Sequence, residues 1–178
     1  GSNVISIPLE GLDQVQTVQA HDVLANDMQF ANKKVVVIGG GITGLETALY
    51  INRQGTNQVS VVDMLPEWPV DMLDMRYQNE ALLEVRHCND QGVALFYNNK
   101  VVKFADGKLF IESTKDGEAK ALPADVIVLS VGVKPNDALW QELLASGHPS
   151  VWKAGDAIAT GKINKAVLHG SKFGYSLN

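Results

Sequence analysis

The chain has 178 residues, of which 46% are hydrophobic and 20% charged, a composition typical of a globular protein of about one domain. Fifteen basic against twenty acidic residues give a formal net charge of −5 without a basic cluster, so we expect no nucleic-acid and no membrane partner. A single cysteine, Cys88, excludes an intrachain disulfide and any cysteine-rich iron–sulfur site, and no apolar run is as long as a membrane span. We therefore expect a cytoplasmic protein.

Residues 3–33 show no clear hydrophobic period apart from a short amphipathic stretch over residues 22–28. The chain begins Gly1-Ser2-Asn3 without a methionine, which is typical of the scar of a cleaved tag. We therefore expect a piece of a longer protein, with residues 1–30 as a lead-in segment that is partly tag-derived.

A strand, a glycine-rich turn, a helix and a second strand follow one another from residue 34. Residues 34–38 (KVVVI) form a β-branched run typical of a strand buried on both faces of a parallel sheet. Apolar residues at helical spacing then run from Ile42 to about Asn52. Residues 59–62 form a second buried strand that ends at Asp63. The order predicts one βαβ unit.

In the second half of the chain, the predicted strands and helices alternate less regularly. Residues 64–71 contain two prolines and predict a loop, followed by a helix over about 72–90 and a third strand at 93–96. Asp-Gly dipeptides, which favour tight hairpin turns, then separate short strands. These strands are predicted at 101–104, 109–113 and 119–122, as an antiparallel meander.

The remaining elements predicted from the sequence are a fourth buried parallel strand, two helices and one short strand. They cover residues 125–130 (strand), 137–146 (helix), 150–153 (short strand) and 162–176 (helix).

The glycine turn matches the pattern GxGxxG between a buried strand and a helix, as that motif requires. Gly39 permits the tight turn, Gly41 lets a pyrophosphate approach the backbone, and Gly44 allows close packing of the helix on the strand. The helix N-terminus presents N–H groups to the phosphates. The turn therefore predicts a dinucleotide site that also includes the loop residues Gly40, Ile42 and Thr43.

Asp63 follows the second strand, 19 positions after Gly44, where an acidic residue accepts hydrogen bonds from the adenine-ribose hydroxyls. A 2′-phosphate beside this carboxylate would be repelled by roughly 4 kcal/mol per unit-charge pair at 4 Å. No Lys or Arg lies between residues 64 and 75, and Arg76 is the first candidate to offset the repulsion. The sequence therefore predicts NADH in preference to NADPH.

Further motifs extend the pattern. The glycine loop continues to Glu46 as GGGxxGxE, residues 129–136 (LSVGVKPN) contain SxGxxPN, and residues 151–157 (VWKAGDA) contain a GD motif before the terminal helix. Together with the meander, these motifs resemble the pyridine-nucleotide domain of the two-dinucleotide flavoprotein oxidoreductases. The chain looks most similar to the C-terminal part of the NADH:flavin oxidoreductase, 2,4-dienoyl-CoA reductase and 2-enoate reductase group related to old yellow enzyme, over residues 8–178.

The resemblance implies an α/β fold, with a Rossmann-like parallel sheet of about four strands and a three-stranded antiparallel β-meander as a crossover. Residues 31–146 would form the NADH-binding domain. Residues 1–30 and 147–178 would belong to an adjoining FAD-binding domain, the latter as a remnant with the GD motif and the terminal helix.

The resemblance also implies roles for single residues. Glu46 would lie near the nicotinamide, Met64 beside Asp63, and Gly132 where the chain passes the cofactor. Gly155 and Asp156 would face FAD. A simply exposed Glu46 and a helix-capping Asp156 remain alternatives. We expect no catalytic residue in this chain. We also expect no metal site, because the four histidines lack metal-ligand spacing.

The function implied is the transfer of hydride from NADH to FAD in an intact enzyme that reduces activated C=C bonds such as enoates or enoyl-CoA. The FAD-binding domain and an FMN barrel of the same parent chain are the expected partners, and the isolated chain is expected to be inactive. Three alternatives stay open: an NADH-sensing module, a small FAD-binding protein, and a methyltransferase that uses S-adenosylmethionine.

Overall fold

The computed structural model describes residues 1–66, 75–148 and 150–176, the side chains of residues 75–80 excepted. Parts of the predicted loop over 64–71 and helix over 72–90 thus lie outside the described residues. The chain forms two compact units: the large unit, Ser6–Val131, and the small unit, Gly1–Ile5 with Gly132–Asn178. It divides after Ile5 and Val131, whereas the sequence predicted boundaries near residues 30 and 146.

The large unit is built on a five-stranded parallel sheet, which confirms the α/β class. In order across the sheet the strands are β2 (Gln16–Gln19), β9 (Val126–Leu129), β3 (Lys34–Ile38), β4 (Gln58–Val62) and β5 (Ala94–Phe96).

Strand β2 is the fifth strand, where the sequence predicted about four. It lies within the predicted lead-in segment and pairs with β9, from Gln16 opposite Val126 to Gln19 opposite Leu129. Its sequence, QTVQ, contains one strongly apolar residue because an edge strand needs less apolar surface than a strand inside the sheet. Pairing with β9 therefore forms this strand without a hydrophobic pattern of its own.

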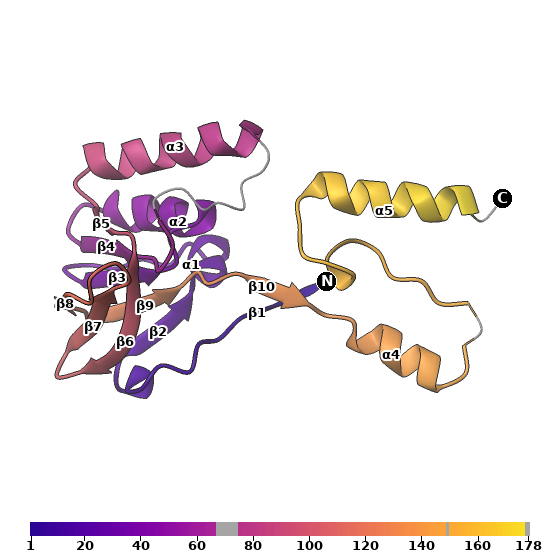
Figure 1. The fold of residues 1–178 in the computed structure, drawn as a ribbon, viewed down its shortest axis with the longest axis horizontal. Helices are drawn as coiled ribbons and strands as arrows, with labels where there is room; N and C mark the ends of the chain where they lie inside the picture. Colours follow the sequence, from indigo (N-terminus) through magenta and orange to yellow (C-terminus); the bar gives the residue numbers. More distant parts are fainter. Residues whose placement is uncertain (67–74, 149, 177–178) are drawn as a thin grey trace. The chain divides into compact units, whose positions relative to one another are not determined.

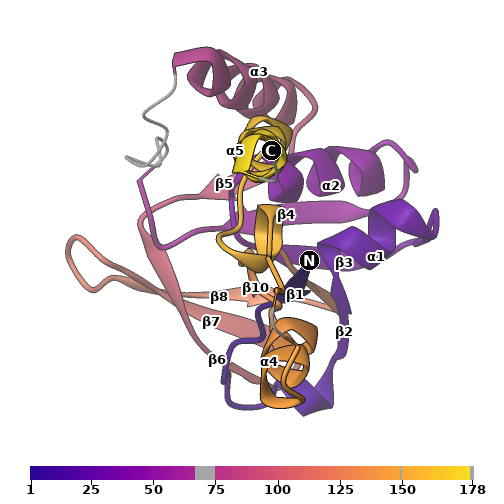
Figure 2. The ribbon, with the colours of Figure 1, turned by 90° about the vertical axis from the view of Figure 1, so that its right-hand side faces the viewer.

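Helices cover one face of the sheet and a meander the other (Figures 1 and 2). The helices are α1 (Ala20–Ala25), α2 (Ile42–Asn52) and α3 (Met75–Asp90). Side chains alternate along each strand, so Val35 and Val37 join the core under the helices, while Val36 and Ile38 join the core under the meander. Among the described residues, no helix is long and apolar enough to cross a membrane.

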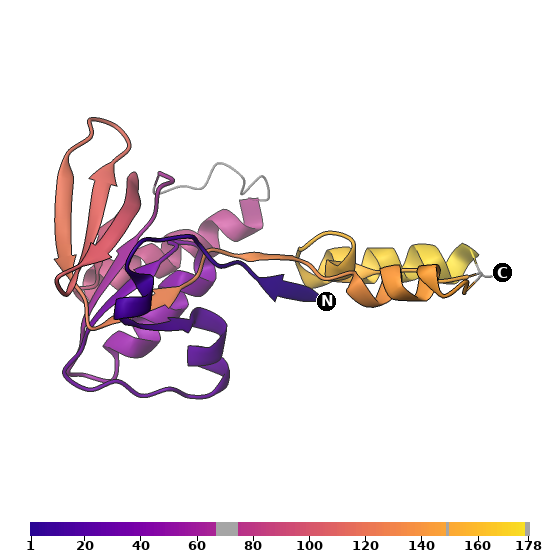
Figure 3. The ribbon, with the colours of Figure 1, turned by 90° about the horizontal axis from the view of Figure 1, so that it is seen from below.

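The predicted three-stranded meander is confirmed. Its antiparallel strands are β6 (Asn99–Ala105), β7 (Lys108–Ser113) and β8 (Ala119–Pro123), seen apart from the helices in Figure 3. The first hairpin turns at Asp106 and Gly107, with φ of 50° and 70°. Positive φ at both central positions is what an Asp-Gly turn supplies.

The small unit contains a two-stranded antiparallel sheet of β1 (Ser2–Val4) and β10 (Val133–Pro135), shown in Figure 1. It also holds α4 (Ala138–Ala145), the 3-10 turn η2 (Gly155–Ala157) and α5 (Ile163–Ser176), close to the two predicted helices. The predicted strand at residues 150–153 was wrong, because the described residues there pair with no other strand. No described side chain of this unit is buried.

Candidate functional site

The glycine turn joins β3 to α2 in very little space. Gly39 has a φ of 110°, and a Cβ built on it would lie 2.2 Å from the carbonyl oxygen of Ser130. The Ser130 N–H in turn donates to the Ile38 carbonyl at 2.8 Å. Only glycine combines this backbone angle with this close approach of the end of β9.

Gly44 brings the first turn of α2 against the same loop. A Cβ at Gly44 would lie 1.9 Å from the Gly39 carbonyl oxygen and 3.3 Å from the Ser130 Cβ. Gly41 differs, since it is exposed and a Cβ there would meet nothing within 4 Å. No side chain caps the N-terminus of α2. The first N–H groups of the helix are therefore available to an anion.

The Asp63 carboxylate reaches across to this loop from the end of β4. Its Oδ2 accepts a hydrogen bond from the Gly40 N–H at 2.6 Å, and its Oδ1 accepts one from the Leu65 N–H at 2.8 Å. A carboxylate has about four acceptor positions, so about two remain for the hydroxyl groups of a ligand. The structure thus brings the predicted acid and the predicted glycines together.

The loop and Asp63 lie at the carboxyl edge of the parallel sheet. The chain leaves β3 toward β4 on one side, while β9 lies on the other side of β3. In open α/β sheets, ligands bind where the strand order reverses in this way. The glycine loop and Asp63 therefore lie at the place in the fold where such sheets bind ligands.

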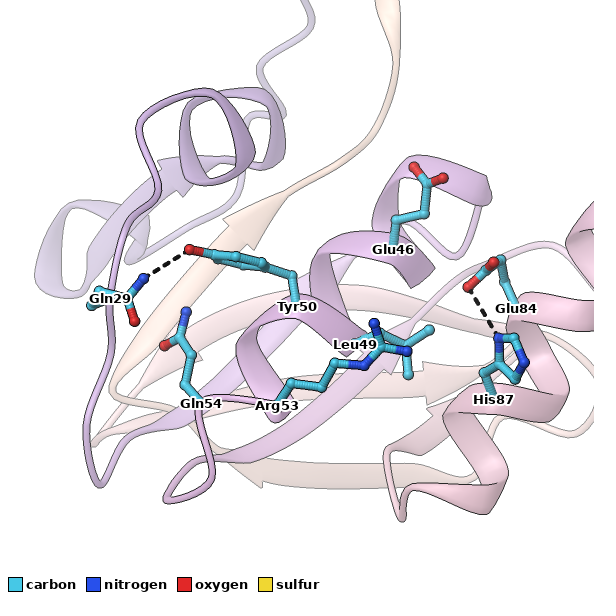
Figure 4. Close-up of a pocket in the computed structure, with 8 residues that line it drawn as sticks. All are labelled: Gln29, Glu46, Leu49, Tyr50, Arg53, Gln54, Glu84 and His87. Carbon is cyan, nitrogen blue, oxygen red and sulfur yellow. Dashed lines mark hydrogen bonds and ion pairs between the residues drawn. The ribbon is translucent and has the colours of Figure 1, made fainter.

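The other predicted residues of the large unit are less enclosed. Ile42 is half-buried, Thr43 is exposed, and Met64 is 62% exposed. Glu46 is exposed on α2, where it lines an open groove of about 540 Å³ between α2 and α3 (Figure 4). The groove contains neither the glycine loop nor Asp63. The role of Glu46 near a nicotinamide stays a prediction.

The predicted FAD-facing residues lie in the small unit. The Gly155 N–H donates to His169 Nδ1 at 3.2 Å. Asp156 accepts hydrogen bonds from the Gly161 N–H at 3.1 Å and from Ser2 Oγ at 3.5 Å. Because α5 begins only at Ile163, Asp156 is not its N-cap.

Gly132 is the first residue of the small unit's second segment and has a φ of 92°. A Cβ built there would meet nothing within 4 Å. Its requirement for glycine therefore comes from the backbone angle and not from a close neighbour.

Two residues around the loop were missing from the predicted site. Ser130 contacts Gly39 and Gly44, and the Tyr97 ring contacts the position of Gly40. Tyr97 directly follows β5 and Ser130 directly follows β9, so both lie at the carboxyl edge of the sheet. That position is the sequence signal by which they could have been found.

A buried strand, a glycine turn, an uncapped helix and a following carboxylate define a dinucleotide-binding α/β domain. The sequence comparison identifies the family: the model of the pyridine nucleotide-disulphide oxidoreductases matches residues 1–170, and the chain belongs to this family. Relatives in it use NAD(P)H and FAD, as the motifs indicated.

The relatives are much longer than this chain. An NADH oxidase from Thermoanaerobacter brockii is 30% identical over 99% of the chain, which spans 27% of that protein. A cinnamate reductase from Clostridium sporogenes is 29% identical over 80% of the chain and 20% of its own length. The structure of a 2-naphthoyl-CoA reductase with 2-naphthoyl-CoA has the same fold, with a TM-score of 0.80 at 24% identity over 98% of this chain and 25% of that one.

Proposed function

We propose that the chain is the NADH-binding domain of a flavin-dependent oxidoreductase and that, in the intact protein, it delivers hydride from NADH to FAD. NADH supplies the hydride when it is bound. The observation that carries the proposal is the pairing of the Asp63 carboxylate with the Gly40 N–H beside the uncapped N-terminus of α2. The Asp63 carboxylate would accept hydrogen bonds from the ribose of a dinucleotide, and the N-terminus of α2 would bind its pyrophosphate.

The same geometry supports a preference for NADH over NADPH. Both Asp63 oxygens are already held by backbone N–H groups, so the carboxylate has little freedom to turn away from a ligand. A carboxylate accepts hydrogen bonds from ribose hydroxyls but repels a 2′-phosphate. The side chain of Arg76, the first cation after Asp63 in the sequence, lies outside the described residues.

We extend the proposal to the whole protein, in which an FAD-binding domain and an FMN barrel of the same parent chain are the partners. Gly155 and Asp156 would contribute to the FAD site. The names of two relatives, a cinnamate reductase and a 2-naphthoyl-CoA reductase, support a conjugated acid or acyl-CoA as the substrate whose C=C bond is reduced. The cytoplasm is the proposed location.

Calorimetric titration of the chain with NADH, NADPH and FAD in parallel tests the proposal. We expect NADH to bind, NADPH to bind more weakly, and FAD not to bind. Binding of FAD in place of NADH would make the chain a flavoprotein in its own right. If none of the three bound, the assignment of the glycine loop and Asp63 to a nucleotide would be refuted.

A further inference from the structure

Gly40 is buried between two side chains of the large unit. A Cβ built on it would lie 2.8 Å from Cε1 of Tyr97, and 3.2 and 3.3 Å from Cβ and Oδ2 of Asp63. The approach to the ring is below the closest distance that real Cβ atoms show, while the approaches to Asp63 are only tight. The Tyr97 ring therefore lies directly against the backbone whose N–H binds Asp63.

The position of this ring is set by the turn between β5 and β6. The Asn99 side chain donates from Nδ2 to the Tyr97 carbonyl at 2.8 Å, and the Asn99 N–H donates to the Asp63 carbonyl at 2.9 Å. The Asp63 N–H donates to the Phe96 carbonyl at 3.0 Å. Tyr97 and Asp63 thus belong to backbone segments that are bonded to each other, and the ring packs on the core under the helices.

We propose that Tyr97 is a positioning residue that sets the preference between NADH and NADPH. Its ring holds the Gly40 backbone so that the Gly40 N–H stays on the Asp63 carboxylate, and the carboxylate stays directed to the ribose. Without the ring, the loop moves and the hydrogen bond from the Gly40 N–H to the Asp63 carboxylate weakens. The carboxylate then turns away from the ribose, so that it repels a 2′-phosphate less. The inference rests on the proposed function for its consequence in binding, but the contact itself can be tested without a ligand.

The first experiment measures hydrogen exchange of the Gly40 amide by NMR in the ligand-free chain. Tyr97→Ala should speed this exchange about tenfold or more, the equivalent of one hydrogen bond to a charged group. Tyr97→Phe keeps the ring and should leave the exchange rate unchanged. Phe110→Ala, which removes a half-buried ring on β7 away from the loop, is the matched control. Should Tyr97→Ala not fold, Tyr97→Leu takes its place.

The second experiment titrates the same variants with NADH and NADPH. Tyr97→Ala should lower the ratio of the NADPH to the NADH dissociation constant about tenfold, with Tyr97→Phe and Phe110→Ala at the wild-type ratio. A purely structural role would weaken both cofactors equally and leave the ratio unchanged. That equal loss, or a Gly40 amide that exchanges in Tyr97→Ala as it does in wild type, would overturn the proposal.

A rescue separates this contact from general damage to the loop. Gly40→Ala alone should lose NADH binding, because its Cβ meets the Tyr97 ring. The double variant Gly40→Ala with Tyr97→Ala should recover part of it, whereas Gly40→Ala with Phe110→Ala should not. If the wild-type chain bound neither nucleotide, the proposed function would fail, and the exchange of the Gly40 amide would still decide whether Tyr97 holds the loop.

Discussion

Asp63 supplies the carboxylate of the candidate site. Two backbone N–H groups hold its carboxylate, one from the glycine loop and one from Leu65 two residues later. Such charge-assisted bonds are short and orient the acceptor before any ligand arrives. An acid oriented in this way can discriminate between ligands because it needs no rearrangement on binding.

Asp63→Ala tests this role directly. We expect NADH binding to weaken by about 1.5–3 kcal/mol, the usual value of hydrogen bonds to a charged group, and NADPH binding to weaken less because a repulsion is also removed. Calorimetric titration with both nucleotides gives the two changes. Asp13→Ala, at an exposed aspartate of the large unit, should leave both affinities unchanged. Unchanged NADH affinity in Asp63→Ala would show that another residue binds the ribose.

Gly44→Ala tests the packing of α2 on its own loop. The new Cβ would lie 1.9 Å from the Gly39 carbonyl oxygen, so the helix has to move. We expect a loss of about 1–3 kcal/mol in the free energy of unfolding, as for other overpacked sites, measured by urea denaturation. Gly170→Ala, also in a helix but with no neighbouring group within 4 Å of the new Cβ apart from the backbone of its own helix, should instead be neutral or gain up to about 1 kcal/mol. Equal effects of the two substitutions would contradict the close contact.

At the scale of elements, the packing of α3 on α2 encloses the single cysteine. Cys88 is 0% exposed, and its Sγ lies 3.9 Å from the Leu45 carbonyl oxygen of α2. Burial, with a smaller effect of Glu84, raises the pKa of the Cys88 thiol from 9.0 to about 11. The thiol therefore stays protonated in the folded chain at a pH where it ionises in the unfolded chain.

This raised pKa predicts a pH dependence of stability. The contribution of Cys88 is fully present below pH 9 and is lost as the pH rises toward 11, because only the unfolded chain releases the proton in that window. Comparing wild type with Cys88→Ala by urea denaturation between pH 8 and 10.5 separates the contribution of Cys88 from the contributions of the other titrating groups. We expect the stability advantage of wild type over Cys88→Ala to shrink as the pH rises. Parallel curves would show that burial does not shift this thiol.

For the whole molecule, the decisive feature is that the buried core belongs to the large unit alone. Among the described residues, every buried hydrophobic side chain lies between residues 20 and 129. The small unit instead exposes large apolar side chains, with Leu139 67%, Ile163 83% and Tyr175 84% exposed. A unit that buries so little apolar surface has little to offset its loss of conformational entropy.

Limited proteolysis should therefore begin in the small unit. Brief trypsin treatment is expected to cleave first after Lys153, Lys162 or Lys172, all in the small unit, and to leave a lasting fragment that contains the whole large unit, identified by mass spectrometry. The central sheet provides the internal comparison. Early cleavage after Lys34, the first residue of β3, or after Arg53, which follows α2, would show that the large unit is the less stable of the two.

The sequence by itself determined the βαβ unit, the glycine turn, the acid that follows it and the meander. Each depends on a local signal: β-branched runs for buried strands, and glycine where the backbone needs positive φ or close contact. Only the tertiary structure decided that residues 16–19 form a strand and residues 150–153 do not, because an edge strand is formed by its partner and not by its own apolar pattern. It alone placed Tyr97 against Gly40, since a contact between residues far apart in the chain depends on how β5 and β3 lie in one sheet.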